Sequence, residues 1–270
     1  MILEVDILPA SSAAPVPRTR LHVDHVPAGA EWKVFGVADG HEWQAAHGVS
    51  TGSARWLTDP MAPLNIESTY RLEAGGDVVA APPITRPFGP GQDWDMGLPW
   101  REYRGWDLIT DLSGRQVAAF IRPHEHARSW EVRSSTLAVG RVPVARYATP
   151  GAPTSTLSAR TTGVSTHVLT ELVESGDPLI VLHQRSPMGR DSVPLSQVVT
   201  VTSASDALAS RRSQEDRIWS LGLTPARPPW RYTAPVATWA DVRRHFGTVG
   251  AVRDSGLTHE QVAAGDWLSW

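Results

Sequence analysis

The sequence contains no cysteine, which excludes several kinds of site together. Without thiols there is no disulfide framework, no cysteine nucleophile and no zinc site built on thiolates. Excess charge is also missing, because 25 Lys and Arg stand against 28 Asp and Glu, a formal net charge of −3. With no basic excess and no basic block, the sequence predicts no nucleic-acid partner.

Long apolar runs are absent as well. No stretch approaches the roughly 20 apolar residues that span a bilayer, so we expect no membrane segment. The first ten residues carry Glu4 and Asp6 where a signal peptide needs an uninterrupted apolar core. We therefore expect the chain to fold in the cytoplasm of the cell that makes it.

Phenylalanine and tyrosine are scarce, at four each, whereas tryptophan occurs twelve times. An indole buries a large apolar area while its N–H still finds an acceptor, which suits both cores and interfaces. The 22 glycines and 22 prolines are well spread and favour short elements joined by turns. A chain of 270 residues is expected to form one large or two medium domains.

Residues 1–86 are predicted to form a β-sandwich like those of immunoglobulin or fibronectin type III domains. Short alternating segments recur every 8–12 residues or so, which is typical of such sandwiches. Asp39-Gly40 is a hairpin signal, and Gly75-Gly76 marks a second hairpin. Residues 87–105 are rich in Pro, Gly and Trp and are expected to be a connector.

Residues 106–230 are predicted to form a second β-sandwich with one flanking helix at 166–175. Thr166 is the expected N-cap and Gly176 the left-handed residue after the helix. The helix should pack one apolar stripe on the sandwich, made of Val168, Leu169, Leu172 and Val173. No long uninterrupted strand pair, of the kind that lines a tube, is evident in the pattern.

Residues 231–270 are predicted to be a Trp-rich helical docking segment. Thr238 and Thr258 open two short helices, which Gly247 and Gly265 end. Such short helices are marginal in isolation and must lean on another surface. The interface candidates are the large apolar residues of this segment and two acids of the preceding helix: Trp239, Phe246, Trp267, Trp270, Glu171 and Glu174.

Clusters that could carry chemistry are few. His124-Glu125-His126 would place two imidazoles on one side of a strand, but no third ligand is identifiable, so a solvated loop is favoured. Acid pairs resembling those of glycosidases are not distinguishable from loop acids, namely Asp93 with Asp95 and Asp107 with Asp111. We expect no catalytic, cofactor-binding or metal-binding residues, hence no cofactor and no enzyme.

The order of features in residues 106–270 matches a known group of proteins. Gly140-Arg141-Val142-Pro143-Val144 precedes a Thr/Ser-rich strand and a helix that ends in Glu171–Gly176. Asp177–Leu182, Trp219–Thr224 and Thr238–Val242 follow in that order. This part resembles minor tail and distal tail proteins of long-tailed, siphovirus-type bacteriophages, particularly those that infect actinobacteria.

The resemblance implies a tail-tube-like β-sandwich that acts as a structural component of a virion tail tip or baseplate. It implies a homo-oligomeric ring, a trimer or hexamer, and neighbours such as the tail tube, the tape measure and other minor tail proteins. Ring assembly would also pair the open edges that a lone sandwich leaves.

The main alternative is a receptor- or carbohydrate-binding module of the virion. It would stack a host surface glycan on exposed indoles, with Trp43, Trp56 and Trp94 as candidates. A hydrolase of cell-wall glycan ranks last.

Truncation after Trp230 tests the prediction for residues 231–270. The shortened chain should keep its cooperative unfolding transition, because the segment belongs to neither core, but it should no longer assemble. Thermal unfolding and light scattering measure the two effects. Loss of the cooperative transition would mean that the segment is part of a core.

Overall fold

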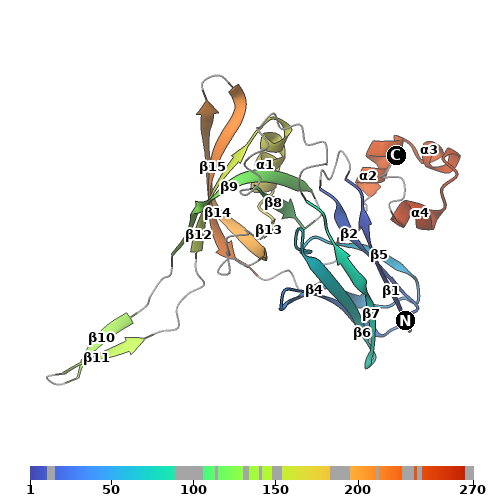
Figure 1. Cartoon of the computed structure of the whole chain (residues 1–270), viewed down its shortest axis with the longest axis horizontal. Coiled ribbons are helices and arrows are strands. Elements are labelled where there is room, and N and C mark those ends of the chain that lie inside the picture. The colour runs from blue at the N-terminus through green and yellow to red at the C-terminus, as the bar shows by residue number, and fades with distance from the viewer. Residues whose placement is uncertain are drawn as a thin grey trace.

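A computed structural model describes residues 1–10, 16–88, 106–112, 115–129, 134–139, 142–147, 154–182, 195–210, 213–226, 234–235 and 239–264. The chain is mainly β, which confirms the predicted fold class. Figure 1 shows two β units side by side, a two-stranded hairpin that projects away from them, and a group of short helices near the C-terminus.

The first unit consists of two antiparallel sheets that face each other. Sheet A has the order β1-β2-β5-β16, with β1 at Ile2–Leu8, β2 at Arg18–Asp24, β5 at Arg55–Asp59 and β16 at Ala234–Pro235. Sheet B has the order β4-β3-β6-β7, with β3 at Glu31–Ala38, β4 at His41–Val49, β6 at Glu67–Ala74 and β7 at Asp77–Thr85. Alternate residues of both sheets meet in one core, among them Leu3, Leu21, Leu57, Val34 and Leu72. The fourth strand of sheet A comes from the C-terminal segment.

The two hairpin turns predicted in this unit are confirmed. Asp39 and Gly40 adopt φ values of 50° and 78° between β3 and β4, and Gly75 and Gly76 adopt 60° and 93° between β6 and β7. Two consecutive residues with positive φ match the right-handed twist of the strands they join.

A bulge in β4 turns Trp43 toward the core. The register pairs Val34 with Ala46 but then Gly36 with Trp43, with a shift between Val34 and Phe35. Trp43 lies across Gly36, where a Cβ would collide with its ring. The extra residue therefore re-aims one side chain, which is a common role of bulges.

Trp43 reaches a buried carboxylate at the end of β5. Asp59 accepts hydrogen bonds from Trp43 Nε1 at 2.9 Å, from the Tyr70 hydroxyl at 2.8 Å and from the Met61 N–H at 2.9 Å. Burial raises the pKa of Asp59 above its ordinary value of 3.8, although these three donors act in the opposite direction. The same burial and the neighbouring Asp59 charge raise the pKa of Tyr70.

Arg86 is the cation buried near this carboxylate. Its Nε donates to the Pro17 carbonyl at 2.7 Å and its Nη1 to the Ala62 carbonyl at 3.1 Å. Burial lowers its pKa to about 10, and the charge of Asp59 partly offsets this effect. Arg86 thus ties two loops of the first unit together at the side that faces the second.

The second unit is a closed six-stranded barrel with the order β12-β15-β14-β13-β8-β9. Its strands are β8 at Trp106–Asp111, β9 at Gln116–Ser129, β12 at Thr154–Thr161, β13 at Leu179–Leu182, β14 at Ser196–Ser210 and β15 at Ser213–Pro225. The helix α1, Val164–Ser175, follows β12 and packs on the barrel core. The sequence predicted two sheets with a flanking helix here. Hydrogen bonding instead joins the six strands into a closed barrel, so that over the paired residues each strand has a neighbour on both sides.

Strands β14 and β15 form a long antiparallel pair of 15 and 13 residues. The sequence pattern showed no long uninterrupted strand pair, and this pair is long but is interrupted by register shifts between Val201 and Ser203 and between Leu208 and Ser210. The pair contains a bulge between Val201 and Ser203, opposite Gly222, where a Cβ would collide with the Ser203 hydroxyl. The bulge interrupts the alternation of side chains, so the two halves of β14 share no single sequence pattern.

The two units meet in a shared apolar cluster. Three of its residues come from the first unit and four from the barrel: Val16, Leu64 and Phe88, with Leu108, Ile180, Leu182 and Val198. The Val16 N–H also donates to Gln116 Oε1 at 3.0 Å across this junction. Residues 89–105 of the expected connector lie outside the described part, but Phe88 at its start is packed into the junction.

The C-terminal helices are α2 at Trp239–Phe246, α3 at Val249–Asp254 and α4 at His259–Ala264. The sequence predicted α2 and α4 but not α3, which Thr248 caps by accepting from the Ala251 N–H at 3.1 Å. At α4 the Thr258 hydroxyl accepts from the Gln261 N–H and Gln261 Oε1 accepts from the Thr258 N–H, a reciprocal cap. The expected cap Thr238 lies outside the described residues.

Replacement of Asp59 by Asn tests the buried network. The amide can accept from two donors but presents its NH₂ group to the Met61 N–H, so we expect a loss of about 1–3 kcal/mol in unfolding free energy. Because the folded pKa is raised, the stability that Asp59 contributes is full below its unfolded pKa and falls as pH rises through the folded pKa. The penalty of Asp59→Asn should therefore shrink between acid and neutral pH.

Urea unfolding at a series of pH values measures this penalty. The exposed Asp77 provides the control, since Asp77→Asn should change stability little at any pH. A penalty that grows as pH rises would show that the three hydrogen bonds outweigh burial and that the pKa of Asp59 is lowered.

Candidate assembly surfaces

Helix α1 buries the stripe that the sequence predicted. Leu169 and Leu172 are fully buried in the barrel core, and Val168 and Val173 pack against it. Gly176 ends the helix with φ 69°, the predicted left-handed residue. These features confirm which face of α1 points inward.

The start of α1 differs from the prediction. The N-cap is Gly163, with no side-chain cap, and Thr166 lies inside the first turn. Its hydroxyl donates to the Glu215 carbonyl at 2.8 Å and lies 2.9 Å from Thr161 Oγ1, which accepts from Trp219 Nε1. Thr166 thus anchors the helix to β12 and β15 instead of capping it, because a tertiary acceptor lies within reach of its hydroxyl.

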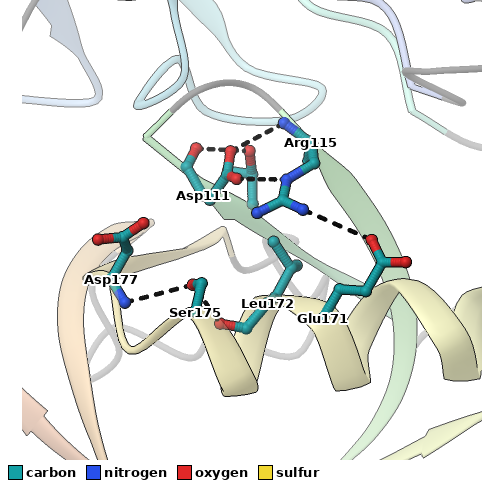
Figure 2. Close-up of polar contacts among 7 residues, drawn as sticks. Asp111, Arg115, Glu171, Leu172, Ser175 and Asp177 are labelled. Carbon is teal, nitrogen blue, oxygen red and sulfur yellow. Dashed lines mark hydrogen bonds and ion pairs between the residues drawn. The ribbon is translucent and has the colours of Figure 1, made fainter.

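The outer face of α1 carries both acidic interface candidates. Glu171 and Glu174 are exposed. Glu171 lies 3.5 Å from Arg115 Nη1, and Arg115 Nε donates to Asp111 Oδ2 at 2.8 Å, as Figure 2 shows. The side chain of Asp111 is buried, whereas that of Glu171 is 65% exposed, so the pair with Glu171 is the weaker part of this chain of contacts.

The β14–β15 pair extends beyond the strands β13 and β12 that flank it in the barrel, and the sequence predicted no site in this extension. β13 pairs with β14 only over Ser196–Val199, and β12 pairs with β15 only over Arg217–Leu223. From Val201 to Ser210, β15 is the one strand in the described part of the chain that pairs with β14. The side chains of residues 202–208 are exposed, including Leu208 at 51%.

A second unpaired element is the hairpin of β10, Ser134–Val139, and β11, Val142–Tyr147. The two strands form a sheet of their own. Figure 1 shows this hairpin well away from the barrel, on a different side from the tip of β14 and β15. Both of its outer edges are open among the described residues.

The C-terminal interface candidates are only partly described. Phe246 is half-buried against Val242 and Val262 and meets the His245 ring edge-on at 4.7 Å. Trp239 begins α2, but its side chain lies outside the described part, as do Trp267 and Trp270 entirely.

The indoles considered for glycan binding are engaged within the chain. Trp43 donates its N–H to Asp59. Trp56 stacks on His22 with ring centroids 4.0 Å apart, and the Arg20 guanidinium lies over the Trp56 ring at 4.7 Å. Trp94 lies outside the described residues. The geometry therefore does not favour Trp43 or Trp56 as sugar platforms.

The described residues hold no group of three or more potential metal ligands. His124, Glu125 and His126 lie on β9, where the ladder to β12 skips from Ile121 to His126, and their side chains are outside the described part. Asp111 of the considered acid pairs is held by Arg115, and the side chain of Asp107 is not described. Asp93 and Asp95 fall outside the described part altogether.

No family model and no curated protein matches this sequence. Among the described helices, none combines the length and apolar character that crossing a bilayer requires. The candidate assembly surfaces described above are therefore identified from their geometry alone.

Two substitutions on opposite faces of α1 separate core from surface. Leu172→Ala should lower the unfolding free energy by about 2–5 kcal/mol, because it removes a fully buried side chain. Glu174→Ala should change it by a few tenths of a kcal/mol, and it should weaken assembly if the outer face is an interface. Thermal unfolding and light scattering of each variant provide the comparison, and a harmless Leu172→Ala would show that the stripe is not packed.

Proposed function

We propose that this chain is a structural subunit of a bacteriophage tail tip and that it assembles with copies of itself into a ring through strand edges. The observation that carries the proposal is the open edge of β14 from Val201 to Ser210. An unpaired strand presents a row of N–H and C=O groups that another strand can pair with.

Two other sheet edges among the described strands, those of β7 and β1, carry features that discourage pairing with another chain. β7 carries Pro82 and Pro83, which cannot donate to a neighbouring strand. β1 carries the acids Glu4 and Asp6 along its length. Over residues 201–210, β14 has no proline and one charged residue, Asp206. This edge therefore has no proline and little charge to prevent pairing with another chain, although a bulge between Val201 and Ser203 interrupts its start.

The hairpin β10–β11 is a candidate partner for this edge, because its own outer strand edges are also open among the described residues. A two-stranded hairpin is marginally stable by itself and gains from joining a larger sheet. Since it does not lie beside the open part of β14 in one chain, the two can pair only between copies (Figure 1). Contact between different surfaces of successive copies is head-to-tail, which closes into a ring when the rotation allows.

The place of this ring in a virion is supported by the resemblance of residues 106–270 to minor and distal tail proteins. On that basis the ring would be a trimer or hexamer next to the tail tube, the tape measure and other minor tail proteins. The function assigned is mechanical, and it includes no catalytic step and no cofactor.

A charge on the open edge tests the proposal. Ala207 is an exposed residue of β14, and Ala207→Lys should abolish the ring while leaving stability within about 0.5 kcal/mol of the parent. Thr156→Lys is the matched control, because Thr156 is exposed on β12, which is paired on both sides. Light scattering and electron microscopy of the purified proteins measure assembly.

Equal assembly of both lysine variants would exclude β14 as the ring contact. A parent protein that stays monomeric at high concentration and binds in a glycan-array screen would instead support the receptor- or carbohydrate-binding alternative.

A further inference from the structure

The edge of sheet A at β5 is closed by a very short strand. β16 pairs Ala234 with Thr58 and Pro235 with Leu57, and the ladder ends there. Proline has no N–H to donate, so this pairing is weaker than two ordinary residues would make. The closure is supplied by the C-terminal segment, residues 231–270, and not by the sandwich itself.

The C-terminal segment has a small core of its own. Val242 and Val262 are buried in one hydrophobic cluster. Phe246, Val252 and Leu257 are partly buried and pack against it. This cluster is separate from the three clusters of the sandwich, the barrel and their junction. Besides β16, the described element of the segment that lies against β5 is α4. The segment can therefore leave sheet A without dismantling another core.

Some polar atoms of sheet A on and beside β5 have no hydrogen-bond partner in the described part of the chain. Thr58 is only 2% exposed although it alternates with core residues and so points out of the sandwich. Within the described part of the chain, Thr58 Oγ1, Trp56 Nε1 and His22 Nε2 are buried without a hydrogen-bond partner. Buried polar groups of this kind oppose the contact that buries them. Of the three, Thr58 lies opposite Ala234 in the register, so its unpaired buried hydroxyl makes the contact with β16 less favourable.

We propose that the C-terminal segment is exchanged between copies, so that in the ring it covers β5 of the adjacent copy. The segment is the occupant that this surface is shaped for, and an exchanged contact is the same contact made in trans. The eight residue steps from Ala226 to Ala234 reach at most about 28 Å, so only an adjacent copy is within range. The exchange rests on the proposed ring, which would hold neighbouring segments at a high effective concentration.

Because the chain has no cysteine, a pair of introduced thiols can report this contact without background. Copies carrying only Thr58→Cys are mixed with copies carrying only Ala234→Cys, partners in the β5–β16 register, and are assembled and oxidised. A disulfide between these positions then requires that the segment of one copy lies on the other. Thr58→Cys removes a hydroxyl that makes no hydrogen bond, so the fold should be retained.

We expect a covalent dimer on a non-reducing gel at a level on the order of tenfold or more above a control mixture of Thr156→Cys and Ala234→Cys copies. The chain that carries both Thr58→Cys and Ala234→Cys should likewise give covalent multimers. Dimer at the control level, with the double variant locked only within single chains, overturns the exchange.

Light scattering of the same samples distinguishes failure of the proposed ring from failure of the proposed segment exchange. Rings with disulfides only within chains would refute the exchange and leave the ring standing. Dimers linked in trans without any ring would support the exchange and refute the ring.

Discussion

Each strand at the border of a sheet must find partners for its N–H and C=O groups, and this requirement organises the whole molecule. In the second unit, closure of six strands into a barrel satisfies it internally. In the first unit, the added strand β16 pairs with the edge of β5. Prolines in β7 and acids on β1 discourage another strand from pairing with those two edges. The requirement stays open in the long extension of β14 and in the β10–β11 hairpin, which therefore become the natural places for contact with other chains.

Such contacts require strand edges that are held in fixed positions relative to one another. The junction between the units supplies this through packed apolar residues and through buried polar groups that have specific partners. Arg86 holds the carbonyls of Pro17 and Ala62, and Gln116 of the barrel accepts from the Val16 N–H. The Val16–Gln116 hydrogen bond crosses the junction and has directional geometry, so it limits rotation between the units, whereas the Arg86 hydrogen bonds fix the loops of the first unit on its own side.

Tryptophans whose side chains the structure describes take part in two kinds of packing. Trp32 and Trp43 lie across Gly48 and Gly36 of the paired strands, filling space that the glycines leave. Trp43 and Trp219 each direct the indole N–H to a buried oxygen, of Asp59 and of Thr161 respectively. Among the described side chains, these indoles serve the folded chain itself. If tryptophan also contributes to interfaces, the C-terminal segment with Trp267 and Trp270 is where we expect it.

Residues close together in the chain determined the features that the sequence predicted correctly: the apolar stripe of α1, the left-handed Gly176, and the turns at Asp39-Gly40 and Gly75-Gly76. Each depends on a few neighbouring dihedral angles and side chains, so the pattern is local. Tertiary structure decided barrel closure, the bulge that turns Trp43 to Asp59, and the pairing of Ala234 with Thr58 far along the chain. It also decided the length of β14, because residues 202–208 are exposed on both faces and lack the apolar alternation that reveals a strand only where one face is buried.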